Sequence, residues 1–159
     1  MHGDFNDPSA SICCYAALLL RLSLGVMYLA HSVVLKWLTF TLTGTAQYFQ
    51  SIGLSPTLAY LTFFAEAIGG VLLILGIQSR WVALALLPIL VGALSVHSGN
   101  GWVFTATGGG WEYPLYLIIL SMAQALLGDG AHAISPSRSL HLKGPLVQGG
   151  IVPPSGGLR

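Results

Sequence analysis

Four apolar stretches constrain this chain more than any other feature. A helix needs roughly 20 apolar residues to cross the ~30 Å hydrocarbon core of a bilayer, and roughly 17–25 are tolerated. The first two stretches are long enough, and the last two lie near the lower limit. Strands are excluded because the runs are long, lack strict alternation, and would expose open sheet edges to lipid. We therefore predict an all-α fold, a bundle of four transmembrane helices over residues 12–35, 57–77, 81–97 and 111–127.

The composition supports a membrane protein. Charged residues make up 7% of the 159 residues and hydrophobic residues 54%, whereas a soluble domain carries about 25% charged residues. So few charges indicate that lipid covers much of the surface. The net charge of +1 and the absence of a Lys/Arg run give no support for nucleic acid as a partner. Cys13 and Cys14 are adjacent and form no C-x-x-C motif, which argues against thiol chemistry of the protein's own.

The domain organisation follows from the apolar stretches. Residues 1–11 contain Asp4 and Asp7 without Lys or Arg, so they do not resemble a signal peptide and are predicted to be an N-terminal cytoplasmic segment. Residues 12–134 form the membrane domain. Residues 135–159 are rich in Ser, Pro and Gly, and we predict a disordered cytoplasmic tail.

The link between the first two predicted spans contains a further element. Tyr48, Phe49 and Ile52 fall at helical spacing in this link and alternate with polar residues. This pattern predicts a short helix that lies in the membrane interface, between the first and second transmembrane helices.

The orientation follows from the positive-inside rule. Four spans place the N-terminus, the link at residues 78–80 and the tail on one side of the membrane. The other side has Lys36 alone. We therefore predict that both termini are cytoplasmic, because the first side holds Arg80, Arg138, Lys143 and Arg159.

Two charged residues stand inside the apolar stretches. Arg21 lies near the middle of the first stretch and Glu66 near the middle of the second. A charge at mid-bilayer costs about 2.5–3.5 kcal/mol on insertion scales, so it is rarely accidental. The two are opposite in sign and could meet. They could bind a cofactor head group or move protons, or they could form a structural ion pair that sets helix register.

A second polar cluster is predicted on the outer side of the membrane, from His31, His97 and Glu112. Two histidines and a carboxylate are metal-ligand types. They come from three separate helices and no spacing motif supports a metal, so we predict none. We expect them to hydrogen-bond loops or line a substrate mouth, and His97 could relay protons.

The charged and polar residues named above, together with several glycine and aromatic positions, occur in an order and at a spacing that resemble the DoxX family of four-helix membrane proteins. The resemblance covers roughly residues 17–135. The family pattern often closes with a glycine pair and a Ser-x-Asp segment, which Gly128, Gly130 and Ser135 fit loosely without the aspartate. The other matching residues are Arg21 and Gly25, His31 and Lys36, Tyr48 to Pro56, Glu66 with Gly69 and Gly70, Gly76, Arg80, His97, Trp102, and Trp111 to Pro114.

The resemblance implies a bacterial cytoplasmic (inner) membrane protein linked to redox work. The family takes its name from a subunit of a thiosulfate:quinone oxidoreductase, and other members are associated with membrane oxidoreductase complexes. The implied function is a quinone-linked redox subunit that receives electrons from a membrane or peripheral redox protein. Arg21 could then donate to a quinone carbonyl and Glu66 could exchange its proton.

Two other functions remain open. The chain could be a non-enzymatic membrane scaffold or assembly partner that packs through small residues such as Gly69 and Gly70. A small transporter ranks last because no internal repeat is visible. The redox function predicts a quinone-sized cavity at Arg21 and Glu66, whereas a scaffold predicts a tight pair there.

Overall fold

The computed structural model describes residues 8–138, so residues 1–7 and most of the predicted tail lie outside the described part. Helices are the main regular structure within residues 8–138, which contain no named strand, only an isolated parallel bridge between Ile77 and Ser135. The predicted all-α fold class is confirmed. In chain order the helices are α1 (Pro8–Leu29), the π-helix η1 (Ala30–Thr39), α2 (Leu42–Ser51), α3 (Pro56–Leu75), α4 (Ser79–His97), the short 3-10 turn η2 (Ser98–Asn100) and α5 (Glu112–Leu127).

Three of the helical segments are long and apolar enough to cross a membrane. These are Ser11–Thr39, Pro56–Leu75 and Ser79–Asn100, whereas α5 has 16 residues and is shorter. All four carry large apolar side chains on their outer faces, including Leu19, Leu61, Val91 and Ile119. A soluble monomer rarely exposes apolar patches on this scale, so these faces suit lipid.

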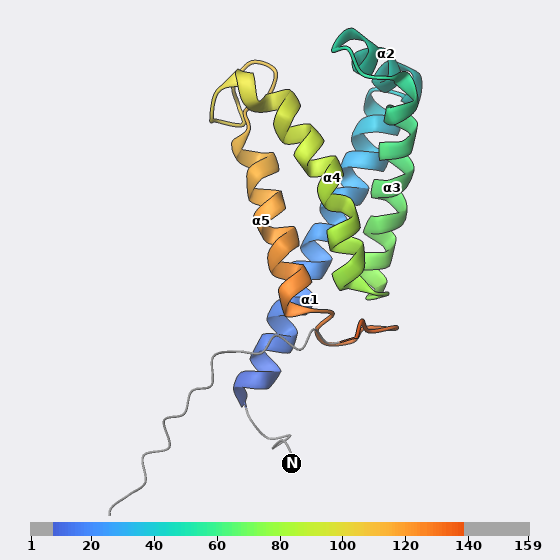
Figure 1. Cartoon of the computed structure of the whole chain (residues 1–159). Helices are drawn as coiled ribbons and strands as arrows, with labels where there is room; N and C mark the ends of the chain where they lie inside the picture. Colours follow the sequence, from blue (N-terminus) through green and yellow to red (C-terminus); the bar gives the residue numbers. More distant parts are fainter. Residues whose placement is uncertain (1–7, 139–159) are drawn as a thin grey trace, which may run out of the picture.

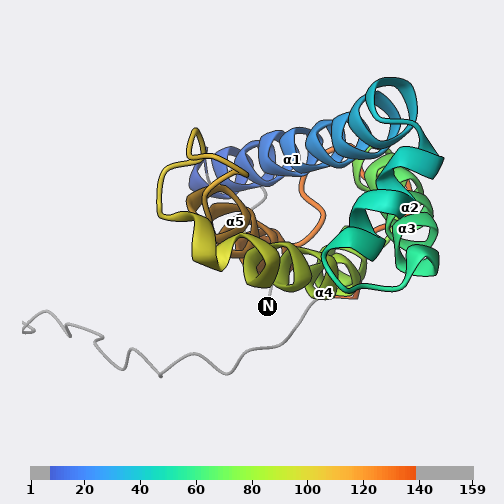
Figure 2. The ribbon, with the colours of Figure 1, turned by 90° about the horizontal axis from the view of Figure 1, so that it is seen from above.

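The helices pack as two antiparallel pairs. α1 packs mainly against α3, and α4 mainly against α5. Figure 1 shows the ribbons of these pairs separating toward the end that carries α2, and Figure 2 shows that end from above. We call the opposite end, where α1 begins and residues 128–138 lie, the base of the bundle.

α1 and α3 approach closely because glycines face each other. A Cβ atom at Gly70 would lie 2.9 Å from the carbonyl oxygen of Gly25, and one at Gly25 would lie 2.9 Å from the carbonyl oxygen of Gly70. Small residues of this kind let membrane helices pack at short backbone distance. The apolar core beside this contact includes Leu24, Tyr28, Leu73, Leu86 and Leu117.

The first membrane helix is longer than the sequence predicted. α1 continues without a break into η1 and ends at Thr39, where the Phe40 amide donates to the Leu35 carbonyl at 2.9 Å. The prediction that the first span ends at residue 35 was therefore too short, and Lys36 lies within a helix rather than in the link. Such π-helical segments are frequent at functional sites.

A helix is present in the link between η1 and α3, as predicted. α2 begins after Thr41, whose side-chain oxygen accepts a hydrogen bond from the Gly44 amide at 3.1 Å. Capping of this kind satisfies an amide at the start of a helix. α2 packs against α3 near the end where the two helix pairs diverge.

Candidate functional site

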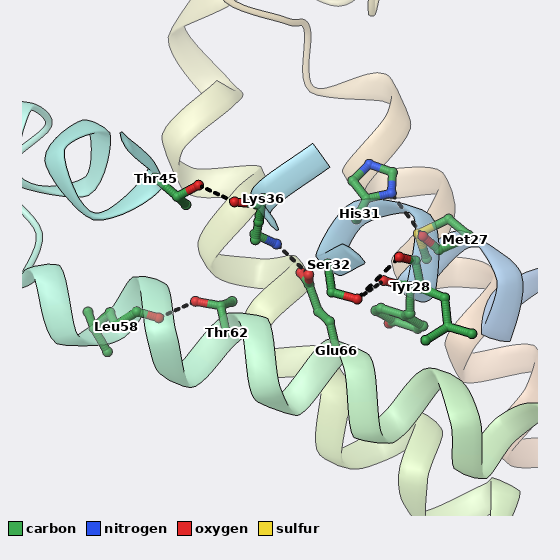
Figure 3. A network of polar contacts seen from close by, with 10 residues as sticks. Met27, Tyr28, His31, Ser32, Lys36, Thr45, Leu58, Thr62 and Glu66 are labelled. Atoms are coloured by element: carbon green, nitrogen blue, oxygen red, sulfur yellow. Dashed lines mark hydrogen bonds and ion pairs between the residues drawn. The ribbon is translucent and has the colours of Figure 1, made fainter. Parts of the chain in front are cut away.

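A buried ion pair joins η1 to α3. The ammonium of Lys36 donates to Oε2 of Glu66, and the two side chains are only 17% and 7% exposed. It is the one salt bridge within residues 8–138. Figure 3 shows the two side chains pointing at each other between the helices. Pairing offsets much of the cost of placing either charge among apolar helices.

Polar side chains surround this pair and are satisfied locally. Ser32 is fully buried, and its hydroxyl donates to the Tyr28 carbonyl at 2.8 Å (Figure 3). The hydroxyls of Tyr28 and Ser121 lie 3.5 Å apart and link α1 to α5. Thr45 of α2 donates to the Lys36 carbonyl at 3.2 Å. The pair therefore lies near polar side chains from α1, η1, α2 and α5.

His31 lies on the same helical segment as Lys36, one π-turn away. Its Nδ1 is 3.0 Å from the Met27 carbonyl oxygen, and because a carbonyl only accepts, Nδ1 is the donor in this contact. The imidazole also stacks on the Tyr113 ring of α5, with centroids 5.7 Å apart and planes 19° apart.

His31, His97 and Glu112 each make a contact of their own. Nδ1 of His97 contacts the Ala93 carbonyl oxygen at 2.7 Å, and its ring lies against Gly109. Glu112 accepts a hydrogen bond from the Phe104 amide at 2.8 Å and so ties down the loop before α5. Within residues 8–138, no group of three or more His, Cys, Asp or Glu side chains could hold a metal ion.

An aromatic pocket of about 300 Å³ lies on the surface beside α5. Tyr113, the residue that stacks on His31, lines it. Trp102 lines it too, and its ring packs edge-on against Trp111 with centroids 4.4 Å apart. We define the aromatic pocket by its lining residues: Trp102, Phe104, Glu112, Tyr113, Leu115, Tyr116 and Ile119.

Arg21 lies at the base, far from the aromatic pocket, and is 1% exposed. Its Nη1 donates to the Asp129 carbonyl at 2.7 Å and its Nη2 to the Ala131 carbonyl at 3.2 Å. A Cβ atom at Gly76 would lie 2.1 Å from Nη1, so only glycine leaves room for the guanidinium. Arg21 therefore ties the segment after α5 to the helix bundle.

The structure separates Arg21 from Glu66. Arg21 stands one turn before Gly25 in α1, and Glu66 stands one turn before Gly70 in α3. The two helices run antiparallel and cross at these glycines. One turn toward the N-terminus of α1 therefore leads to the base, whereas one turn toward the N-terminus of α3 leads to the α2 end. The two residues are thus displaced by about 6 Å each to opposite sides of the crossing. Glu66 therefore pairs with Lys36, which lies on its own side.

Asp129 and Arg80 complete the base, and the sequence reasoning predicted neither as a site residue. Asp129 accepts hydrogen bonds from the Ser79 amide at 2.6 Å and the Ser137 amide at 2.7 Å. Arg80 donates to the carbonyls of Ala125 and Leu126 at the end of α5. An aspartate between two glycines after the last apolar stretch was the available signal.

The environment of Asp129 favours its charged form. Burial alone would raise the pKa of Asp129, but hydrogen bonds from Ser137 and Ser79 outweigh burial and lower the pKa below its ordinary value of 3.8. We call Arg21, Arg80 and Asp129, with the segment that they hold, the base cluster. Its hydrogen bonds run mainly to backbone groups, which suits a structural role.

The comparisons with known proteins identify the family. The DoxX family profile matches residues 16–99. This chain belongs to the DoxX family. The resemblance seen in the sequence is thereby confirmed, and the apolar helices of this DoxX protein are those of a multi-pass membrane protein.

One curated relative and the solved structures complete the comparison. The DoxX protein is 32% identical over 119 residues to "Putative oxidoreductase CatD" of Bacillus subtilis (strain 168). The aligned region covers 75% of this chain and 84% of the relative. No solved structure gives a significant match.

Proposed function

We propose that this DoxX protein is a membrane subunit of a quinone-linked oxidoreductase system, in which Glu66 exchanges protons. The buried Lys36–Glu66 pair is the observation that carries the proposal. Charges in membrane helices are costly and mark ion paths, proton relays or ligand sites. The name of the Bacillus relative adds support for a redox role.

Of the two charged residues inside the apolar stretches, Glu66 is the better candidate for a functional role, as a site of proton exchange. Both terminal nitrogens of Arg21 already donate to backbone carbonyls, and an arginine cannot be deprotonated in proteins. Glu66 has a single charged partner, and Lys36 is partly exposed, which leaves a route for protons from the α2 end. Quinone reduction takes up protons as well as electrons. The electrons would come from a redox protein bound to the membrane or to this subunit.

The proposal includes a topology. α5 is the fourth crossing, its short apolar helix extended by Trp111 at one end. α2 lies in the membrane interface, as its mixture of exposed Tyr48 and glutamines suggests. Arg80 and Arg138, both at the base, support a bacterial inner-membrane topology with both termini in the cytoplasm and the α2 end outside.

A non-enzymatic scaffold is the second candidate. The observation in its favour is the tight base cluster, where the guanidinium of Arg21 packs against Gly76 and donates to backbone carbonyls. In addition, neither Arg21 nor Glu66 lines the aromatic pocket. A scaffold needs only the helix packing and not a titratable Glu66.

The test begins with purification of the protein from native membranes in a mild detergent, followed by mass spectrometry of co-purifying lipids and proteins. The proposal expects a bound quinone or a stoichiometric redox enzyme. Its second arm measures quinone-dependent electron transfer in membranes against pH. Glu66→Gln is expected to lose most of the activity at every pH, whereas Asp129→Asn, a matched carboxylate change at the base, should leave the pH profile unmoved. Full activity in a destabilised Glu66→Gln variant would favour the scaffold.

A further inference from the structure

We infer that the aromatic pocket beside α5 is the binding site for a quinone head group, an inference that rests on the proposed function. The sequence had placed such a site at Arg21 and Glu66. The structure has an open surface pocket between α5 and the loop before it, where seven residues line about 300 Å³. Pockets for small molecules begin at about this size.

The lining of the aromatic pocket matches the chemistry of a quinone ring. Trp102, Phe104 and Tyr116 offer flat apolar surfaces against which a planar ring can stack. Tyr113 and Tyr116, which line the pocket, each carry a hydroxyl group, and neither hydroxyl has a hydrogen-bond partner within residues 8–138. A phenolic O–H can donate to a quinone carbonyl.

The charge of the aromatic pocket selects against an anionic head group. Glu112 is its one charged lining residue, and it is negative. An anionic phospholipid head group would meet a like charge there, whereas a quinone is neutral. A plain acyl chain has no acceptor for the tyrosine hydroxyls. A neutral ring with carbonyl acceptors therefore fits better than an anionic head group or a plain acyl chain.

The position of the aromatic pocket allows entry from lipid. Tyr116 and Ile119 are 60% and 54% exposed on the outer face of α5, the face that is apolar enough for lipid contact. A lipid-soluble ligand can reach the site sideways without crossing water. Its apolar tail would then remain in the bilayer.

The aromatic pocket is connected to the ion pair through two side chains. Tyr113 lines the pocket and stacks on His31. His31 stands one π-turn from Lys36, which holds Glu66 (Figure 3). His31 is thus the residue that adjoins both the proposed ring site and the proposed proton site.

The experiment measures binding of a short-chain, water-soluble quinone to the full-length protein in nanodiscs by isothermal titration calorimetry. Tyr113→Phe removes one hydroxyl and keeps the ring that stacks on His31. It is expected to raise the Kd about tenfold, the effect of one lost hydrogen bond. Ile119→Trp fills the aromatic pocket from its lipid side and should raise the Kd by at least about tenfold.

Each variant has a matched control on α3. Tyr60 is 38% exposed against 39% for Tyr113, so Tyr60→Phe tests for general effects of losing a hydroxyl. Ile68 is 58% exposed against 54% for Ile119, so Ile68→Trp tests for added bulk at a lipid-facing position. Both controls should keep the wild-type Kd.

The outcomes separate this inference from the proposed function. If the wild type binds the quinone and the aromatic-pocket variants bind equally well, the site is elsewhere and only this inference fails. If an alkylbenzene without carbonyls binds as tightly as the quinone, the pocket is a plain apolar groove and the inference again fails. If the wild type binds no quinone and none co-purifies from native membranes, both fall.

Discussion

Two buried charged sites in this protein use their charges differently. In the base cluster, Arg21 and Arg80 donate to backbone carbonyls at or beyond the end of α5. At the other site, Lys36 pairs with the side chain of Glu66, a group that can gain or lose a proton. A guanidinium bound to carbonyls holds segments together and has no protonation change to offer. An ammonium–carboxylate pair whose lysine is partly exposed can exchange protons. The two sites should therefore respond differently to substitution.

The largest expected effect comes from Lys36→Met. Removing one partner leaves the Glu66 carboxylate buried without its counter-charge, which typically costs about 3–5 kcal/mol. The free energy of unfolding in detergent measures this loss. The double variant Lys36→Met/Glu66→Leu should recover most of the stability because no charge is left unpaired. If the double variant is as unstable as the sum of the single changes, the pair is not the relevant interaction.

A smaller and more local effect is expected for Arg21→Met. The buried carbonyl of Asp129 loses its donor, at about 1–3 kcal/mol. The carbonyl of Ala131 is only partly buried, so water can replace its lost donor at little further cost. Hydrogen exchange should then increase at the amides of Ile134 and Ser135, which bond to Leu75 and Gly76. The exposed Arg138 serves as the control, and Arg138→Met should leave that exchange unchanged. Faster exchange around Lys36 instead would mean that the two sites are not independent.

Between the two sites lies the glycine crossing of α1 and α3. Gly70→Ala places a methyl group 2.9 Å from the Gly25 carbonyl oxygen and from Leu29 Cγ, so the helices must separate, at about 1–3 kcal/mol. Gly92→Ala in α4 meets nothing within 4 Å and should be neutral or slightly stabilising. Thermal unfolding of both variants in the same detergent measures the contrast. Equal stability of the two would show that the crossing is loose.

The smallest effect is the pH dependence contributed by Asp129. Its pKa is lowered in the folded protein, so its ionised form stabilises the fold at any pH above the ordinary value of 3.8. This contribution is lost as the pH falls through the lowered folded-state pKa. Wild type should therefore be more stable than Asp129→Asn at pH 6, and the difference should shrink in acid. A difference that stays constant down to strongly acidic pH would contradict the assignment.

Much of the fold could be predicted from local patterns. The four apolar stretches form helices near their predicted positions. The helical spacing of apolar residues between the first two stretches predicted a helix where α2 lies. The burial of Arg21 and Glu66 was also foreseen, because both stand inside apolar runs. What failed was partner assignment. Glu66 pairs with Lys36, a residue placed outside the helix because the π-helical extension to Thr39 leaves no signature in hydropathy.

The sequence by itself determined that this chain is helical, that its helices suit lipid, and that it resembles the DoxX family, since these depend on residue type and short-range spacing. Only the tertiary structure decided which charges meet. Antiparallel packing at Gly25 and Gly70 places Arg21 and Glu66 on opposite sides of the crossing. The return of residues 128–138 to the base gives Arg21 its carbonyl partners. Such contacts depend on register between segments distant along the chain, and a single sequence does not encode register in any local pattern.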